Sequence, residues 1–444
     1  MLITNGPLLT FDPEHPFFDR GAVRIEDGRV TEAGDAASVG QDPGSGEEVL
    51  DAAGRLILPG WIDVHTHLYS AFARGIALKE DPPENFVQIL ERLWWRLDRV
   101  LDLEDVRLSA LVGLVACIRN GTTTVIDHHA SPSAIEGSLD VLADAFGQSG
   151  LRGVLCYEVT DRNGEAGMKA GIGENVRFLK KVKDEGDKGG RLGALFGLHA
   201  PLTLSDDTLA RCLDAGRAVG DEVGFHVHVS EHEFEVTDSL NRYGKRPLQR
   251  LRDAGVLGGN SIAAHCIHVD EGDLAALRET EAIAVHNPQS NMNNAVGCAP
   301  IRKWTGVLAG LGTDGMTADM MASARAAYLL QKHEAKDPRV AWDEVRALLT
   351  AGNPAIASRL LKRPVGVLRP GALGDVVISD YLPPTPLRGE NFWGHLLYGA
   401  AGLQARTVVV GGGVVMRDRA LSSLDEEEIF AKARERAAKV WERF

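Results

Sequence analysis

Short apolar runs alternate with longer helix-like stretches through the middle of the chain, between Pro59 and about Pro364. This alternation is typical of parallel strands that are connected by helices. Eight strands are predicted, at residues 61–64, 123–127, 153–159, 193–198, 224–229, 261–264, 282–285 and 307–311. Eight strand–helix units within about 300 residues predict an α/β protein built on a closed (β/α)8 TIM barrel, in which chemistry takes place at the C-terminal ends of the strands.

The two ends of the chain show a different pattern, in which short apolar runs are separated by Gly, Pro and Asp. This pattern predicts small antiparallel strands and turns. The two pieces, residues 1–58 and 365–444, are expected to pair into one domain beside a barrel of residues 59–364. Ser423 and Glu426 form a capping box before apolar residues at helical spacing, so a closing helix is predicted over residues 423–444.

Composition and charge narrow the range of functions. Hydrophobic residues make up 44% and charged residues 25% of the chain, which excludes a disordered or fibrous protein. The formal net charge of −14 argues against a general affinity for nucleic acid or anionic membranes, so a small-molecule ligand is expected. No apolar stretch approaches the roughly 18 residues of a membrane span, and residues 1–15 lack a secretory signal. Five widely spaced cysteines without a Cys-x-x-Cys pair fit a reducing cytoplasm.

Histidines gather where the predicted strands end. A large share of the fourteen histidines end or follow a strand: His65, His67, His128, His129, His199, His226, His228, His265, His268 and His286. Asp314 ends the eighth strand. Because the C-terminal ends of barrel strands meet on one face, these side chains are expected to converge there.

A metal site is the interpretation that this clustering favours. His65 and His67 lie on the same face of their strand, because side chains alternate with a period of two, so both can reach one ion. Zinc takes nitrogen and carboxylate ligands and keeps a position open for water in catalytic sites. His65, His67, His228 and Asp314 supply such a set. His226 shares a face with His228, however, and spacing alone does not choose between them. Iron or manganese would also accept these ligands.

Two further residues suggest catalysis. Glu231 lies just beyond the fifth strand, where its carboxylate could shuttle the proton of a metal-bound water; the alternative is a surface ion pair. His265 ends the sixth strand and could direct an N–H group at the reacting oxygen.

Five of these segments together resemble the amidohydrolase superfamily, in its branch of chlorohydrolases, guanine deaminases and adenosylhomocysteine deaminase-like enzymes. They are residues 59–67, 225–231, 263–266, 286–291 and 311–314. The resemblance covers essentially the whole chain, and the C-terminal segment 366–378 is similar to the small β-sandwich of that superfamily. Residues 70–75, 81–86, 93–98 and 156–163 are most similar to the SsnA-type aminohydrolases.

The resemblance implies roles for the candidate residues. The metal ligands would be His65, His67, His228 and Asp314, with Glu231 as acid/base and His265 as the residue that orients the water. Members with two metals carry a bridging lysine at the end of the fourth strand, where this chain has Leu198 and His199, so one divalent ion is expected, with zinc as the first choice. Leu93 replaces a glutamate that precedes the substrate-loop tryptophan in related deaminases. A homodimer is also expected by resemblance.

The predicted activity is hydrolytic deamination of a nitrogen heterocycle, such as a purine-like or pterin-like ring, by a zinc-activated water. Asp314 would serve as both ligand and base. Hydrolytic opening of a cyclic amide of the imidazolone or hydantoin type uses the same nucleophile, and the sequence does not separate the two reactions. Dechlorination is a third possibility, although Glu231 favours a leaving group that must be protonated. A zinc protein without catalysis is a fourth possibility, because a fold by itself does not establish a function.

Several residues on predicted loops above the strand ends are candidates for substrate contact. They are Arg74, Trp95, His128, His199, Ser290 and Asn291. His129, His268 and His286 are candidates for orienting the metal ligands. The glycine-containing segment 161–191 is expected to form either a mobile lid or a helix with loose ends.

Overall fold

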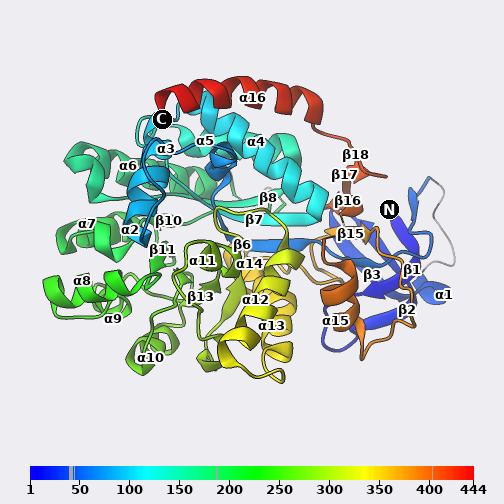
Figure 1. The fold of residues 1–444 in the computed structure, drawn as a ribbon. Coiled ribbons are helices and arrows are strands. Elements are labelled where there is room, and N and C mark those ends of the chain that lie inside the picture. The colour runs from blue at the N-terminus through cyan, green and yellow to red at the C-terminus, as the bar shows by residue number, and fades with distance from the viewer. Residues whose placement is uncertain (40–43, 45, 187–188, 403) are drawn as a thin grey trace.

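Nine strands in the middle of the chain form a closed barrel, seen in a computed structural model that describes residues 1–39, 44, 46–186, 189–402 and 404–444 (Figure 1). One parallel sheet contains β6 (Trp61–Thr66), β7 (Thr122–His129), β8 (Arg152–Tyr157) and β9 (Leu192–Ala194). The other contains β10 (Phe196–Leu198), β11 (Phe225–Val229), β12 (Ile262–His265), β13 (Ile283–His286) and β14 (Ala309–Leu311). Parallel bridges from Thr66 to Asp314 and from Val159 to Leu198 join the two sheets at both edges.

The eight-stranded barrel predicted from the sequence is therefore confirmed. One predicted strand, residues 193–198, is divided at Leu195 into β9, which pairs with β8, and β10, which pairs with β11. Most barrel strands are buried along their whole length, as expected for strands covered on both faces.

Helices surround the barrel and follow its strands in order. The longer ones are α4 (Leu103–Asn120), α5 (Ser138–Ser149), α6 (Gly164–Glu185), α7 (Asp206–Arg217), α8 (Glu233–Tyr243), α9 (Pro247–Asp253), α10 (Glu271–Thr280), α12 (Met320–Ala335) and α14 (Asn353–Leu361). Shorter helical segments are η1 (Leu68–Ala73), α2 (Phe86–Ile89), η2 (Leu90–Trp94), α3 (Trp95–Val100), η3 (Asp161–Asn163), η4 (Pro201–Thr203), α11 (Pro288–Asn293), η5 (Ile301–Lys303), α13 (Trp342–Ala347) and η6 (Leu348–Gly352). Among the described residues, no helix is both long enough and apolar enough to span a membrane.

The segment 161–191 forms a helix, one of its two predicted alternatives. It folds as η3 followed by the 22-residue helix α6, and residues 187–188 of the prediction lie outside the described part of the chain. The side chain of Asn175 on α6 donates hydrogen bonds to the carbonyl oxygens of Tyr157 and Gly171, so this helix is held against β8.

Both ends of the chain contribute to one nine-stranded sheet beside the barrel (Figure 1). Its strands are β1 (Leu2–Leu9), β2 (Phe17–Glu26), β3 (Arg29–Asp35), β4 (Val49–Asp51), β5 (Ile57–Pro59), β15 (Val376–Ser379), β16 (Ala405–Val410), β17 (Gly413–Arg417) and β18 (Ala420–Leu421). Antiparallel pairing of β15 with β5 joins the two ends of the chain. The short helices α1 (Ala36–Val39), α15 (Phe392–Gly394) and η7 (His395–Ala400) lie in connections of this part. The domain limits at residues 58 and 364 stay predictions.

The closing helix α16 (Glu426–Arg443) is present, but its predicted capping box is wrong. The side chain of Asp425 accepts the cap hydrogen bond from the backbone N–H of Glu428. The Ser423 hydroxyl instead donates to the carbonyl oxygen of Ser149. Aspartate caps helices as well as serine does, and its position two residues later moves the helix start. The helix then crosses over α4 (Figure 1).

Candidate active site

The four predicted metal ligands lie at the C-terminal ends of the barrel strands, in two overlapping groups: His65 with His67 and Asp314, and His65 with His228 and His265. His65 and His67 lie on β6, His228 lies on β11, and Asp314 follows β14. The Nε2 atom of His67 is 3.1 Å from Nε2 of His228 and 3.2 Å from Oδ1 of Asp314, and Nε2 of His65 is 4.0 Å from the same oxygen. All four residues are buried.

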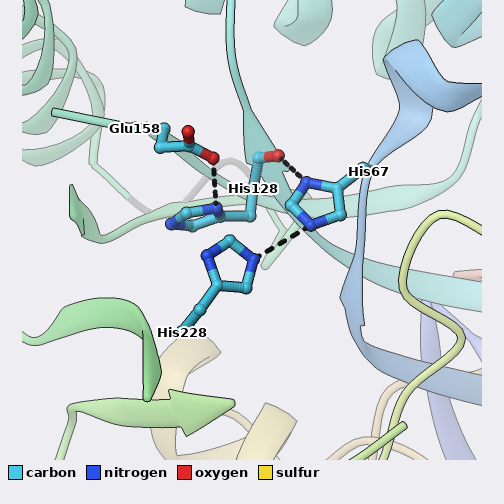
Figure 2. A group of neighbouring side chains, drawn as sticks. All are labelled: His67, His128, Glu158 and His228. Atoms are coloured by element: carbon cyan, nitrogen blue, oxygen red, sulfur yellow. Dashed lines mark hydrogen bonds and ion pairs between the residues drawn. The ribbon is translucent and has the colours of Figure 1, made fainter. Parts of the chain in front are cut away.

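The hydrogen bonds of His67 and His228 leave a lone pair on the Nε2 atom of each ring. Nδ1 of His67 donates to the carbonyl oxygen of His128 at 2.5 Å, and Nδ1 of His228 donates to that of His199 at 2.8 Å. Because a carbonyl oxygen only accepts, each Nδ1 carries the hydrogen, and a neutral ring then keeps a lone pair on Nε2. The two Nε2 atoms in Figure 2 therefore face each other lone pair to lone pair. This contact needs a positive charge.

A divalent metal ion fits that requirement better than a proton does. Burial lowers the pKa of His67, but the hydrogen bond and charge of Asp314 outweigh it and raise the pKa to about 9, so a proton could serve one contact. The Nε2 atom of His65, however, is buried with no hydrogen-bond partner among the residues that the structure describes. Zinc binds such ligands at about 2.0–2.2 Å, which places tetrahedral neighbours about 3.3 Å apart, close to the separations around His67. The donor set therefore suits a divalent ion.

His226 has a different position from His228. Its Nε2 atom lies 2.8 Å from Nδ1 of His65, and its ring is fully buried. This hydrogen bond fixes the orientation of the His65 ring and leaves Nε2 of His65 directed at the centre. Of the two histidines that spacing could not separate, His228 adjoins His67, and His226 contacts the Nδ1 side of His65.

Three strand ends carry non-glycine residues in the left-handed backbone region. Ser230, His265 and Asp314 have φ values of 53°, 75° and 56°. Such conformations are sparsely populated and collect at functional sites, where the surrounding structure holds them in place. Asp314 is held by its backbone N–H, which donates to the carbonyl oxygen of His65. The turn after each strand thus directs a polar group inward.

Glu231, His265 and Asp314 form a second group beside the ligands. Nε2 of His265 is 3.5 Å from Glu231 and 3.6 Å from Asp314. The amide nitrogen of Asn291 donates to Nδ1 of His265 at 2.8 Å, so the ring hydrogen is on Nε2, which has no hydrogen-bond partner in the described chain. This N–H group is available for an oxygen atom between the three side chains.

The two carboxyl groups of this trio have opposite pKa shifts. Burial, reinforced by the charge of Asp314, raises the pKa of Glu231 well above its ordinary value. Burial also acts to raise the pKa of Asp314, but its hydrogen bond and charge interaction with His67 outweigh that effect and lower it far below the usual range. One carboxyl group is therefore set to hold a proton and the other to remain ionised, which is the arrangement needed for acid/base work.

Glu158 was not predicted as a site residue, yet it lies next to the ligands (Figure 2). Oε2 is 3.4 Å from Nδ1 of His128, and Oε1 is 3.7 Å from Nε2 of His199. Burial acts to raise the pKa of Glu158, but His199 and His128 lower it well below the ordinary range. The predicted third strand ran through residue 159, whereas β8 ends at Tyr157, so Glu158 is a strand-end residue that the prediction placed inside a strand.

Glu158 also belongs to an alternative group of metal-binding side chains, with His67, His128 and His228. This group uses the same Nε2 atoms of His67 and His228 as the predicted set, because both Nδ1 atoms are bound to carbonyl oxygens. One nitrogen lone pair binds one ion. The two groups therefore cannot each hold an ion at the same time. A single ion agrees with the absence of a bridging lysine from the end of the fourth predicted strand.

A cavity opens beside these groups, and His67, His228, Glu231, His265 and Asp314 line part of it. Of the predicted substrate contacts, Trp95, His199 and Ser290 line it, and so do Asp98, Glu235 and Asn294, which sequence reasoning missed. The other three predicted contacts do not line it: His128 and Asn291 are buried behind the wall, and Arg74 is exposed to solvent.

The three histidines expected to orient the ligands have other surroundings. Nε2 of His129 bonds to the hydroxyl of Ser131, and Nε2 of His268 donates to the carbonyl oxygen of Val296. Neither nitrogen of His286 has a hydrogen-bond partner in the described part of the chain. His226, which the sequence offered as an alternative ligand, contacts His65 instead.

The chain is similar to known deaminases over nearly its whole length. The chain is 32% identical over 443 residues to 5'-deoxyadenosine deaminase of Methanosarcina mazei, covering 98% of this chain and 97% of that relative. It is 30% identical over 448 residues to 5-methylthioadenosine/S-adenosylhomocysteine deaminase of Syntrophomonas wolfei, covering 99% of each.

Solved structures share the fold at lower identity. A zinc-bound adenosine deaminase from Xanthomonas campestris superposes with a TM-score of 0.86 at 22% identity, covering 99% of this chain and 98% of that one. A zinc complex of atrazine chlorohydrolase from Arthrobacter aurescens gives 0.81 at 19% identity, covering 98% and 99%. The Amidohydrolase family profile matches residues 56–415. As its strand-end motifs predicted, the chain belongs to the amidohydrolase family.

Proposed function

We propose that this protein is a metal-dependent aminohydrolase that removes an amino group from a purine-like heterocycle. The observation that carries the proposal is the group of Glu231, His265 and Asp314, which overlaps the groups formed by the other proposed ligands His65, His67 and His228. Two curated relatives with deaminase names, each matched over nearly the whole chain, support deamination over ring opening or dechlorination.

His65, His67, His228 and Asp314 would hold one divalent ion, with zinc as the proposed metal. Such an ion lowers the pKa of a bound water to about 7 and so supplies a hydroxide nucleophile at neutral pH. Zinc is bound in the solved adenosine deaminase that shares this fold. The homodimer and the single ion both stay predictions.

The remaining steps fall to three side chains. Glu231 would deliver a proton to the ring nitrogen next to the attacked carbon, which makes that carbon electrophilic. His265 would donate its Nε2 hydrogen to the attacking oxygen and hold it in place. Asp314 would accept the remaining hydroxyl proton and pass it toward the departing amino group, so that ammonia leaves and a ring carbonyl forms.

Ammonia release tests the proposal. The metal-loaded protein should be assayed with adenine, guanine, cytosine, 5'-deoxyadenosine, 5'-methylthioadenosine and pterin. Glu231→Gln should lower the rate by about 10²- to 10⁴-fold, the usual contribution of a positioned acid/base. Glu233→Gln, an exposed carboxylate two residues away, is the matched control and should keep full activity. A product with a new carboxylate and no free ammonia would replace deamination with ring opening.

A further inference from the structure

The side chains of the cavity wall that could contact a charged substituent are acidic rather than basic. Among the described residues, no lysine or arginine lines the cavity. Five carboxyl groups line it: Asp98, Glu158, Glu231, Glu235 and Asp314. The guanidinium group of Arg162 lies close behind the wall, but it is hydrogen-bonded to Asp98, and its Nη2 atom is 3.8 Å from Glu158. A phosphate or carboxylate in the cavity would therefore meet carboxyl oxygens, including those of Glu158 and Asp314, and no lysine or arginine among the described residues.

Glu158 keeps unused acceptor capacity toward the cavity. Its side chain is 4% exposed, and its neighbours His128, His199 and Arg162 lie 3.4, 3.7 and 3.8 Å away. These distances are too long for strong hydrogen bonds. An ionised carboxylate has about four lone-pair sites, and leaving them unpaired in a buried position is unfavourable. An N–H group of a bound ligand could donate a hydrogen bond to one of these carboxylate oxygens.

Glu158 and Glu231 lie beside different ligands of the proposed metal site. Glu158 is grouped with His67 and His228, whereas Glu231 is grouped with Asp314. A planar ring above the centre can therefore present its reacting carbon to Glu231 and an N–H edge to Glu158. Trp95 and His199 line the cavity near this edge, with their ring centroids 6.0 Å apart, and supply flat surfaces for such a ring.

We propose that Glu158 determines the substrate specificity of this cavity: it accepts a hydrogen bond from an N–H group of the heterocycle and restricts the substrate to free bases or nucleosides without an anionic group. Nucleotides are excluded. The inference rests on the proposed function, because it concerns the same cavity.

Equilibrium binding tests this inference separately from turnover. Calorimetric titrations would use the metal-loaded Glu231→Gln protein, whose slow turnover leaves each ligand intact. The ligand pairs are adenine and 5'-deoxyadenosine against adenosine 5'-monophosphate, and guanine against guanosine 5'-monophosphate. We expect at least one uncharged member to bind tenfold or more tightly than its anionic counterpart. A preference below tenfold in every pair, including no binding at all, overturns the proposal.

A second substitution assigns the preference to Glu158. Adding Glu158→Gln should weaken binding of the preferred uncharged ligand by about 10- to 100-fold, the effect of losing one charge-assisted hydrogen bond, and should reduce its preference over the anion. Glu165→Gln, an exposed carboxylate on α6, is the matched control. Unchanged affinity in a folded Glu158→Gln protein would overturn the role of Glu158. If that variant does not fold, the comparison of uncharged and anionic ligands still decides the substrate class. Absence of ammonia release with the binding order intact would defeat the proposed reaction and leave this specificity standing.

Discussion

Replacing His226 with phenylalanine should weaken metal binding without removing the metal site. The Nε2 atom of His226 lies 2.8 Å from Nδ1 of His65, and the ring is fully buried. Phenylalanine keeps a ring of similar size and removes the acceptor. The N–H group of His65 then has no partner, and the His65 ring is free to turn its Nε2 atom away from Asp314.

Two independent arguments give similar free-energy costs for the His226→Phe substitution. A buried donor left without its partner costs about 1–3 kcal/mol. Loss of a partner that orients a metal ligand lowers metal affinity by about 10- to 100-fold, which corresponds to about 1.4–2.7 kcal/mol. Competition with a chromophoric zinc chelator measures this difference directly. His228→Phe removes a proposed ligand and should abolish stoichiometric zinc.

His286→Phe is the matched control for both variants. His286 is a fully buried histidine at the end of the neighbouring strand β13, and neither of its ring nitrogens has a hydrogen-bond partner in the described chain. Its replacement should leave zinc affinity within about twofold of the wild type. If His226→Phe loses zinc completely and His228→Phe retains it, the roles of these two histidines are reversed. If His226→Phe behaves like the control, the hydrogen bond to His65 does not position the ligand.

Three other changes should have measurable effects. Burial raises the pKa of Glu235 to about 8 from its ordinary 4.5, so between these pH values the folded chain holds a proton that the unfolded chain has lost, and the free energy of unfolding falls by about 1.4 kcal/mol per pH unit. Glu235→Gln should lack this contribution when thermal unfolding is measured at pH 5, 6.5 and 8. Equal pH dependence of stability in the variant and the wild type would contradict this prediction. Arg152 forms a buried bidentate ion pair with Asp375, with both hydrogen bonds at 2.8 Å. Arg152→Met should therefore lower the free energy of unfolding by about 3–5 kcal/mol, and with it the melting temperature. An unchanged melting temperature would show that this ion pair does not stabilise the fold. A Cβ atom at Gly312 would lie 2.7 Å from the carbonyl oxygen of His65, so Gly312→Ala should reduce zinc content, and full zinc occupancy would show that the strands can separate there.

The sequence predicted the barrel and the convergence of its polar residues because both depend on local patterns. Apolar runs of strand length mark β6 and β11, and the alternation of side chains places His65 with His67, and His226 with His228, on one face each. Barrel closure then brings the strand ends together whatever the loops do. Asp314 could be named for the same reason, since it directly follows a strand.

Features that depend on where an element stops were not predictable to the same degree. Glu158 was missed because the third strand was extended by two residues, and the closing helix was assigned a serine cap because the pattern fits at Ser423 as well as at Asp425. Glu235 was missed for a different reason. It lies on a helix, one turn beyond Glu231, and accepts a hydrogen bond from the backbone N–H of Glu231, a contact that only the folded turn creates.

The choice between His226 and His228 shows why a short motif does not define this site. Both side chains point into the barrel, and only their depth separates them. The distance of 2.8 Å from His226 to His65 and that of 3.1 Å from His228 to His67 show two layers of paired rings, one from β6 and one from β11. Within each layer the ring from β6 lies near Asp314, with Nε2 of His65 at 4.0 Å and Nε2 of His67 at 3.2 Å from its Oδ1 atom. Each Nδ1 atom is in turn held by a group on another strand or the loop after it, so the orientation of every imidazole depends on the closed barrel. The metal site is therefore a property of strand register around the whole barrel, and a shift of β11 by two residues would place His226 where His228 now lies while leaving the sequence motif unchanged.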